Sequence, residues 1–495
     1  MTVKRLSAST LSTLPSAVRR PTYDRAALGI GLAHIGVGAF HRCHQQEFAD
    51  DMLEARFGPW GIVGINLFPP RVAPQLTPQD GLYARTLRDG DRAETRVLGA
   101  LKSVIEVDDK ASAERAIAAL AAPELAAVTM TLTEKGYCLT PSTGALDRAN
   151  AGLEADVNGV SPPRTAIGLL ARALDRRRAL GLDGLSLLSC DNIPNNGARL
   201  RAAILGFANL TSPALADWIE RRVAFPSSMV DRIVPATKPD DLAAAAAVLG
   251  ARDEATVVGE PFRQWVIEDR FAAARPPWDL AGVEFVSDAK PYEQIKMRLL
   301  NGAQSTLSHL GALSGHEFSH QAANDPVLSA FTLSMLTRES AQTVPRIASM
   351  EPEPYIASAL ARVRNTAIGH RCHQIGSDGS QKVGQRLLDP LRERLARGES
   401  AELLTLGVAA WIAYVLAGAK RFGERWAPDD PFAAKIIAIG DKGGALPEVA
   451  REILAIAPIF GDLAHSGLAE AVGAHLAGLL GADPRAHVRQ RLDHV

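Results

Sequence analysis

The feature that most constrains the fold of this chain is a change of sequence pattern near Val286. Before this residue, short apolar runs alternate with amphipathic helical stretches, whereas the later residues keep helical spacing and give almost no strand signal. Strands that alternate with helices are typical of a parallel, doubly wound sheet. We therefore predict an α/β domain with a parallel sheet over residues 1–285 and an all-α domain over residues 286–495.

Four apolar runs supply the predicted strands, and helical runs such as SAERAIAALAAP and RTAIGLLARALDRRRALG lie between them. The strands are expected at Gly29–Ile35, in the run WGIVGINLF, at Ala126–Cys138 and at Gly184–Asn192. The carboxyl ends of the strands in an open parallel sheet face the ligand crevice. Polar residues that follow these runs are therefore candidates for a binding site.

Charge and cysteine content exclude several classes of protein. The 495 residues carry a formal net charge of -1, which gives no electrostatic reason to expect a nucleic-acid or membrane partner. Leu403–Ala419 has no charged residue, but it is shorter than the roughly 20 apolar residues of a spanning helix, so we interpret it as a buried core helix. The four cysteines lie far apart and indicate reduced thiols in a cytoplasmic enzyme. They are Cys43, Cys138, Cys190 and Cys372.

A phosphate-binding turn is predicted at Gly36–Gly38, between the first strand and a helix that begins near His41. Glycines at such a turn let the backbone approach a pyrophosphate, and the following helix offers free N–H groups. The third glycine of the usual pattern is missing, and a plain strand-to-helix turn is the alternative. The second strand also lacks the acid that commonly binds the ribose of NAD. Because Arg71 follows that strand, NADP is an alternative to NAD unless Arg71 is an ordinary solvated residue.

Two polar clusters stand beside apolar runs. Asp191 and Asn192 end the fourth predicted strand, where they would face the crevice, and an Asx turn is the alternative. Asp231 and Arg232 lie among apolar residues in MVDRIVP, for which a buried ion pair or a helix cap is the ordinary interpretation.

A third cluster lies in the apolar helical run KMRLLNGAQS, which contains Lys296. Burial lowers the pKa of a lysine, which can then act as a general base near neutral pH. On an ideal α-helix Asn301 lies about 140° away from Lys296. Lys296 and Asn301 can share a site only if the long lysine side chain extends around the helix or if the helix bends at Gly302. Asn301 and Gln304, three residues apart, are neighbours on the helix surface.

Seven motifs occur in an order that resembles the long-chain polyol dehydrogenases, that is, the mannitol dehydrogenase family. They are HIGVGAFHR, TLTEKGYC, SCDN with the following NG, MVDRI, EPFRQWVIED, PYEQIKMRLLNG and SDGSQK. The resemblance covers the chain from about Gly31 to the final helices. It implies a Rossmann-type N-terminal domain that binds a dinucleotide and a helical C-terminal domain that binds substrate. It also implies a monomeric enzyme that oxidises a secondary alcohol with NAD or NADP and without a metal.

The resemblance also implies roles for individual residues. Lys296 corresponds to the catalytic base, and Asn192 and Asn301 correspond to asparagines that donate hydrogen bonds to the developing alkoxide. The substrate-contact positions are Asp231, Gln304, Gln374 and Lys382. The cofactor positions are Ile35, Gly36, Gly38, Ala39, Phe40, Asn66, Thr133 and Asp191.

Two departures from the mannitol dehydrogenases concern the substrate. Gln304 replaces a histidine and Gln374 replaces an arginine. The glutamine at position 374 and the stretch His370–Leu395 are similar to the fructuronate reductase branch, which interconverts D-mannonate and D-fructuronate, although that branch keeps the histidine that Gln304 replaces. A sugar acid would need cationic partners for its carboxylate. Three candidates lie nearby in the sequence, namely Arg371, Lys382 and Arg386.

D-Mannonate is therefore the favoured substrate, and the alternative is activity as a D-mannitol 2-dehydrogenase or a D-arabinitol 4-dehydrogenase. A non-catalytic dinucleotide sensor is the hypothesis from a different class of protein. Such a sensor would have no need for a proton acceptor like Lys296.

The sequence HRCHQ occurs twice, at His41–Gln45 and at His370–Gln374, and it combines residue types that bind zinc. Its His-x-Cys-His spacing lacks the paired patterns of structural zinc sites, and the family that it resembles is metal-independent. We therefore predict no metal site and interpret the repeat as coincidence. His370 or His373 could still line the substrate pocket, with an ordinary surface histidine as the alternative.

Overall fold

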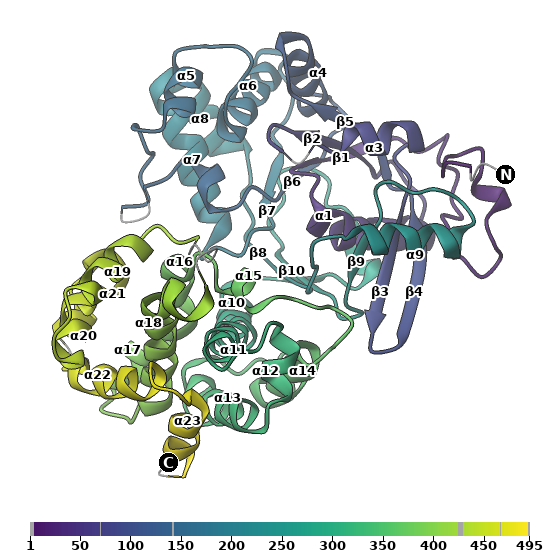
Figure 1. The fold of residues 1–495 in the computed structure, drawn as a ribbon. Helices are drawn as coiled ribbons and strands as arrows, with labels where there is room; N and C mark the ends of the chain where they lie inside the picture. Colours follow the sequence, from purple (N-terminus) through teal and green to yellow (C-terminus); the bar gives the residue numbers. More distant parts are fainter. Residues whose placement is uncertain (1–3, 70, 141–142, 424–428, 466, 494–495) are drawn as a thin grey trace. The chain divides into compact units, whose positions relative to one another are not determined.

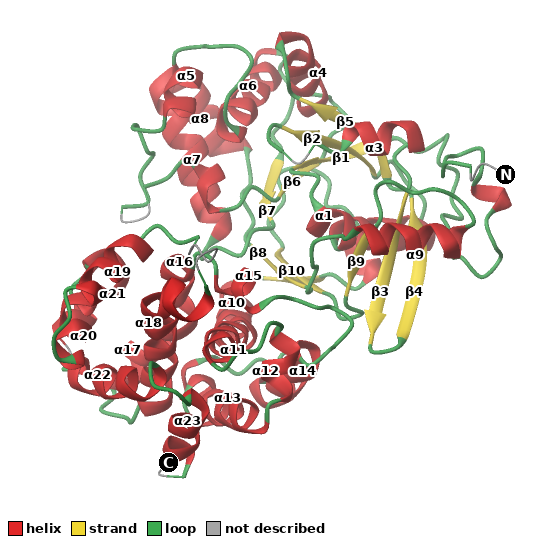
Figure 2. Cartoon of the chain, viewed as in Figure 1, coloured by secondary structure: helices red, strands yellow, loops and turns green. Residues whose placement is uncertain are grey.

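The computed structural model describes residues 4–69, 71–140, 143–423, 429–465 and 467–493. The chain divides into two compact units, Met1–Lys290 and Pro291–Val495. Every strand named in the described residues belongs to the first unit, and the second unit is built from helices (Figures 1 and 2). The predicted fold class, a parallel-sheet α/β domain followed by an all-α domain, is confirmed.

The first unit is organised around a five-stranded parallel sheet with the strand order β5-β2-β1-β6-β7. The strands are β1 (Ile30–Ile35), β2 (Gly61–Asn66), β5 (Leu101–Glu106), β6 (Ala127–Met130) and β7 (Ser186–Ser189). Four of them were predicted, and the edge strand β5 was missed. The strand expected at Ala126–Cys138 is shorter than predicted, because the chain leaves the sheet after Met130 and forms a 3-10 turn at Glu134–Tyr137.

Helices cover both faces of this sheet because successive strand residues point to opposite sides. Ala33 and Ile35 pack into one apolar core with α4 and α6, whereas Leu32 packs into a second core with α2. The helices of this unit are α1 (Ala39–Cys43), α2 (Gln45–Ala55), α3 (Ala73–Leu76), α4 (Lys110–Leu120), α5 (Ala151–Val157), α6 (Ala166–Ala179), α7 (Asn196–Thr211), α8 (Pro213–Arg222) and α9 (Pro239–Leu249).

Two three-stranded mixed sheets complete the first unit, and sequence patterns did not predict them. Their orders are β4-β3-β9 and β11-β10-β8. The strands are β3 (Tyr83–Asp89), β4 (Arg92–Leu98), β8 (Ser228–Asp231), β9 (Val257–Gly259), β10 (Gln264–Glu268) and β11 (Glu284–Val286). β3 and β4 are rich in charge, yet Arg85 and Arg96 are buried because they form ion pairs with Glu47 and Asp51.

The second unit packs around α11, all of whose residues are buried, and α18 lies against it. No helix in the described ranges is long and apolar enough to cross a membrane, and α18 serves as a core helix. The helices are α10 (Lys290–Ile295), α11 (Gly302–Leu313), α12 (Ser319–Asn324), α13 (Pro326–Arg338), α14 (Pro352–Val363), α15 (Cys372–Gly376), α16 (Gly379–Val383), α17 (Asp389–Ala396), α18 (Glu402–Phe422), α19 (Ala433–Asp441), α20 (Leu446–Leu454), α21 (Ala457–Phe460), α22 (Leu468–Leu479) and α23 (Pro484–Leu492). Two π-helical segments join them, η5 (Lys296–Asn301) and η7 (Gly384–Leu388).

Candidate active site

The turn between β1 and α1 is fixed by close contacts of its backbone. Gly36 has φ +94°, and a Cβ atom on it would lie 2.2 Å from the carbonyl oxygen of Thr131. Only glycine tolerates both conditions. The Thr131 hydroxyl donates to the Gly36 carbonyl at 2.8 Å, and the Val37 N–H donates to Asn66 Oδ1 at 2.7 Å. A Cβ atom on Gly38 would meet no protein atom closer than 3.9 Å, so the space beside Gly38 is open to a ligand.

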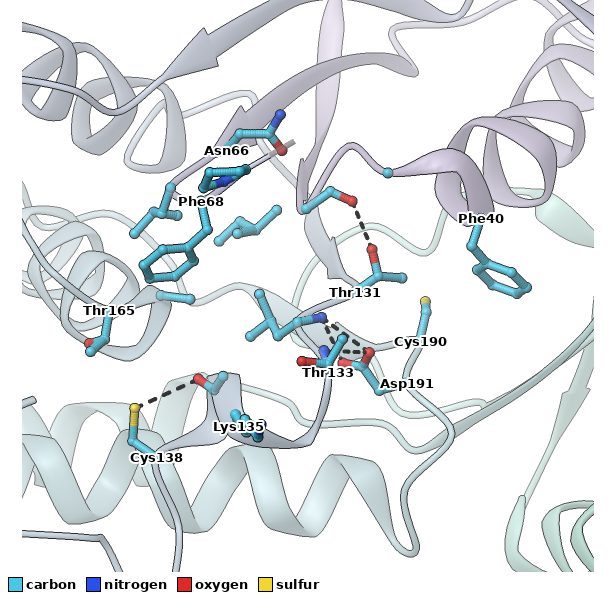
Figure 3. A pocket seen from close by; sticks show the side chains of 18 of the residues that line it. Phe40, Asn66, Phe68, Thr131, Thr133, Lys135, Cys138, Thr165, Cys190 and Asp191 are labelled. Carbon is cyan, nitrogen blue, oxygen red and sulfur yellow. Dashed lines mark hydrogen bonds between the residues drawn. The ribbon is translucent and has the colours of Figure 1, made fainter. Parts of the chain in front are cut away.

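This turn borders a cavity of about 730 Å³ at the carboxyl ends of β1 and β6 (Figure 3). In the order β5-β2-β1-β6-β7 the connections change direction between β1 and β6, and ligands of open α/β sheets bind at such a switch point. All the predicted cofactor positions line this cavity, and so does Asn192. The prediction omitted other lining residues, among them Phe68, Thr131, Lys135, Thr165 and Cys190. Thr131 directly follows β6, but the predicted strand ran on to Cys138, so the prediction did not place Thr131 at a strand end.

Asp191 supports the rim of this cavity through hydrogen bonds to a loop far away in the sequence. Its carboxylate accepts the backbone N–H groups of Leu132 and Thr133, both at 3.0 Å (Figure 3). It also accepts the Tyr137 hydroxyl at 2.6 Å. Burial raises the pKa of Asp191, although these three donors oppose the shift. Thr133 has φ +61°, a conformation that a β-branched residue rarely adopts. Asp191 therefore holds a strained residue at the edge of the pocket.

The end of β2 carries no acid, but a carboxylate reaches it from the neighbouring strand. Glu106, at the end of β5, accepts a hydrogen bond from Asn66 Nδ2 at 3.3 Å and from the Val72 N–H at 2.8 Å. Arg71 forms ion pairs with Glu106, at 3.7 Å, and with Asp108. Arg71 is not among the residues that line the cavity. Because its guanidinium is engaged in these ion pairs, Arg71 is neither available for the 2′-phosphate of NADP nor an ordinary solvated residue. The sequence argument for NADP is therefore weaker.

In the second unit, Lys296 and Asn301 occupy the two ends of the π-helical segment η5, and both are buried. π-Helical hydrogen bonds join residue i to residue i+5, so residues five apart lie nearly one above the other. The angle of about 140° expected for an α-helix does not apply. The structure thus brings Lys296 and Asn301 to one face without a bend at Gly302, which continues as regular helix.

The Asn301 amide is oriented by the residue one turn further on. Asn301 Nδ2 donates to Gln304 Oε1 at 3.3 Å, as their spacing predicted. Asn301 Oδ1 is buried and has no hydrogen-bond partner among the described residues. An amide nitrogen carries two hydrogens, so one N–H of Asn301 stays available after the contact with Gln304.

The remaining polar residues predicted for the second unit differ in exposure. Gln374 lies exposed on α15, whereas Lys382 on α16 is partly buried and donates to the carbonyl oxygens of Ile375 and Ser377. Burial, followed by the charge of Arg386, lowers the pKa of Lys382 to about 8. Of the other two predicted cations, Arg371 is exposed and paired with Glu317, while Arg386 in η7 donates to Ser305 Oγ at 2.9 Å.

Asp231 and Arg232 are both buried at the end of β8 in the first unit. Arg232 forms an ion pair with Glu47 of α2 and also donates to the carbonyl oxygen of Cys43. Buried charges are stable only when they are paired and hydrogen-bonded. Arg232 therefore belongs to a buried ion pair, which is one of the two ordinary interpretations of MVDRIVP. Through Glu47 and Cys43 it connects α1 and α2, which follow the Gly36–Gly38 turn, to the end of β8, the strand that contains Asp231.

The two HRCHQ segments belong to different units and have different partners. His41 accepts from the Gln46 side chain at 2.8 Å, and His44 Nε2 donates to the Gln264 carbonyl at 3.0 Å. His373 hydrogen-bonds to the Tyr414 hydroxyl at 2.9 Å. In the described part of the chain, no three potential ligands among His, Cys, Asp and Glu come together as a metal site would require.

Comparisons with known proteins agree over both units. Residues 30–280 match the mannitol dehydrogenase Rossmann domain, and residues 288–480 match the mannitol dehydrogenase C-terminal domain. The chain is 38% identical to the D-mannonate oxidoreductase of Escherichia coli over 91% of its own length and 92% of that protein. It is 37% identical to a mannitol 2-dehydrogenase of Pyrenophora tritici-repentis, over 89% of this chain and 78% of that protein.

A solved structure, the mannitol 2-dehydrogenase of Pseudomonas fluorescens in a ternary complex with NAD and D-mannitol, superposes with a TM-score of 0.89. The two chains are 33% identical, and the match covers 99% of each. Both domain matches, together with relatives above 30% identity over nearly the full length, establish that this chain is an oxidoreductase of the mannitol dehydrogenase family.

Proposed function

We propose that this protein uses NAD to interconvert a secondary alcohol and a ketone of a sugar acid, with D-mannonate and D-fructuronate as the favoured pair. Residues 1–285 would bind the dinucleotide, and residues 286–495 would supply the substrate pocket and the base. The observation that carries the proposal is the π-helical segment η5, which stacks buried Lys296 and Asn301 on one face. A buried amine beside an amide donor is the pair that alcohol oxidation needs.

The cavity at the Gly36–Gly38 turn suits a dinucleotide. The space beside Gly38 permits close approach of a pyrophosphate to the backbone, and Asn66 and Asp191 already hold the surrounding loops. NAD is favoured over NADP because Arg71 is already paired with Glu106 and Asp108, and Glu106, which contacts Asn66 without lining the cavity, adds negative charge behind it. The Pseudomonas relative was solved with NAD. The bound nicotinamide would supply the acceptor for the carbinol hydride.

The side chains of this protein would accept the proton, stabilise the alkoxide and hold the substrate. Lys296, as a neutral amine, would accept the hydroxyl proton of the substrate. Asn192 and Asn301 would donate hydrogen bonds to the developing alkoxide, and Gln304 would keep the Asn301 amide in its donating orientation. The hydroxyl and acid groups of the substrate would be held at four contact positions, and Gln304 is one of them. These positions are Asp231, Gln304, Gln374 and Lys382.

A neutral polyol is the second candidate substrate, because the Pseudomonas relative was solved with D-mannitol. Incubation of the purified protein with D-mannonate, D-mannitol, D-arabinitol or D-sorbitol, each with NAD and with NADP, tests both candidates. The proposal expects reduction of NAD with D-mannonate and a product that NMR identifies as D-fructuronate. Turnover of the polyols but not of D-mannonate would refute the sugar-acid assignment.

A further inference from the structure

Two cations of the second unit lie close together without a carboxylate partner. Lys382 on α16 and Arg386 in η7 are four residues apart, and both segments pack against α11. Neither side chain forms an ion pair with any residue in the described ranges. Arg371, the third basic residue of this region, does form one, with Glu317. Of these three cations, Lys382 and Arg386 are thus the two without an ion pair in the described residues.

Arg386 is the less compensated of the two. Asp378, Asp429 and Asp430 act on Lys382 at long range and raise its pKa, although burial and the charge of Arg386 outweigh them. For Arg386 burial is the sole resolved influence, and it lowers the pKa to about 10. Arg386 is partly buried, and a partly buried cation without an ion-pair partner is less stable than a paired one, so a bound anion would stabilise it.

The donors around Arg386 converge in a way that fits a carboxylate. Its Nη1 donates to Ser305 Oγ at 2.9 Å, and Ser305 is buried. A guanidinium carries five N–H donors in a planar fork, so most of them remain after this contact. The Ser305 hydroxyl, which accepts from Arg386, can still donate its own hydrogen. Several donors and a positive charge at one place are the requirements for bidentate carboxylate recognition.

His309 of α11 lies in the same region, close to Lys382 and Arg386, and it brings no negative charge. It is 3% exposed, and neither ring nitrogen has a hydrogen-bond partner among the described residues. Burial, followed by the charges of Lys382 and Arg386, lowers its pKa to about 3, so the ring is neutral at physiological pH. The cluster Ser305, His309, Lys382 and Arg386 therefore has spare donors and a net positive charge.

We propose that Arg386, aided by Lys382 and the Ser305 hydroxyl, binds the carboxylate of the sugar-acid substrate and thereby selects an acid over a neutral polyol. This assignment rests on the function proposed above. Ser305 follows Asn301 by four residues on the helix, so a rise of about 6 Å, slightly more than one helical turn, separates the carboxylate site from the oxyanion donor. That separation suits a substrate whose carboxylate and reacting carbinol are several bonds apart, as in D-mannonate.

Replacement of Arg386 tests the assignment by comparing an acid with a neutral substrate. For Arg386→Gln we expect kcat/KM with D-mannonate to fall by at least about 30-fold, mainly through KM, because a charged partner of the carboxylate is lost. Turnover of D-mannitol, or its inhibition constant against D-mannonate if it is not turned over, should change little. Ser305→Ala should show a smaller loss of the same kind. Arg371→Gln, which removes an exposed and already paired arginine, is the matched control and should behave like wild type.

Two further measurements separate substrate recognition from misfolding. Added guanidinium ion should restore part of the D-mannonate activity of Arg386→Gln, and NADH binding should be unchanged. If Arg386→Gln does not fold, Arg386→Lys keeps the charge but loses the fork, and it should still lose D-mannonate selectively. Equal losses for acid and polyol, or no loss, would overturn the carboxylate site. Absence of D-mannonate turnover in the wild type would instead overturn the proposed function itself.

Discussion

The cavity of the first unit and the polar cluster of the second unit differ in how their hydrogen-bonding groups are used. Around the cavity, Gly36, Asn66 and Asp191 all have protein partners, and the loops they hold are fixed before any ligand arrives. In the second unit, Asn301 Oδ1 and both ring nitrogens of His309 are buried without partners in the described residues. Since buried polar groups are normally satisfied, the second arrangement indicates groups reserved for a ligand.

This difference indicates that the cavity of the first unit is formed before its ligand binds, whereas the polar cluster of the second unit is completed by its ligand. A rigid pocket suits a cofactor shared by many dehydrogenases, because no ordering cost accompanies its binding. Unsatisfied polar atoms and cations without an ion pair suit a substrate that must supply the missing partners, and they reject molecules that cannot. Substrate preference should therefore respond to changes in the second unit, whereas changes at the turn of the first unit should affect cofactor binding.

The largest expected effect comes from Lys296. Lys296→Met removes the amine while roughly preserving buried volume, and it should lower kcat by about 100- to 10,000-fold, the usual contribution of a general base. NADH binding, followed by fluorescence titration, should stay at the wild-type level because the cavity is in the other unit. Lys290→Ala, at an exposed lysine of α10, is the control. If the protein is a dinucleotide sensor, the wild type itself has no turnover of substrate, and Lys296→Met cannot lower kcat.

The two glycines of the turn should separate fold from cofactor binding. Gly36→Ala forces a Cβ atom against the Thr131 carbonyl at positive φ, so both thermal stability and NADH affinity should fall, the latter by roughly 10-fold or more. Gly38→Ala meets no protein atom closely, so the melting temperature should stay near wild type while NADH affinity drops. Equal affinity in Gly38→Ala and wild type would show that the pyrophosphate does not approach this turn.

A smaller effect should follow the ionisation of Lys382, whose pKa is lowered to about 8. The ammonium form exists below this value and is lost above it, so KM for D-mannonate should rise as the pH rises through about 8, by roughly 10-fold once the charge is gone. Lys382→Gln should start from the higher KM and flatten this part of the profile. Lys420→Gln, at an exposed lysine of α18, should keep the wild-type profile. A profile that Lys382→Gln leaves unchanged would remove Lys382 from the site.

The smallest effect is expected at Arg71. It is paired with Glu106 and Asp108 outside the cavity, so Arg71→Ala should change the ratio of NAD to NADP activity by no more than about twofold, within the range of a partly exposed ion pair. Glu106→Gln should raise NADP activity more clearly, because it removes the charge beside Asn66. Loss of NADP activity in Arg71→Ala would restore the interpretation of Arg71 as a phosphate ligand.

Local patterns predicted the parts of the fold that depend on continuous apolar runs. The strands β1, β2, β6 and β7 are buried on both faces and are therefore apolar, so the sequence reveals them. β5, β3 and β4 were missed because half-polar or charge-rich strands do not stand out. Arg85 and Arg96 become core residues only through carboxylates distant in the sequence. Long-range compensation of this kind leaves no local pattern.

The part of the candidate site that could be predicted from the sequence consists of residues that directly follow strands. Gly36, Gly38 and Asp191 belong to the turns after β1 and β7, and these positions alone indicate a crevice. The relation between Lys296 and Asn301 was not predictable, because the α-helical period places them apart and only the π-helical segment stacks them. The contact of Arg386 with Ser305 likewise depends on how η7 packs against α11, which no sequence spacing reveals.

The most direct test of the central claim is the ratio of kcat/KM for D-mannonate to kcat/KM for D-mannitol, with NAD and the wild-type protein. Arg386 and Lys382, the two cations of the second unit's cluster without an ion pair, predict a ratio far above one, and they predict that Arg386→Gln brings it down. A ratio near or below one would mean that these groups do not recognise an acid, and the division between a preformed cofactor site and an acid-selective substrate site would be wrong.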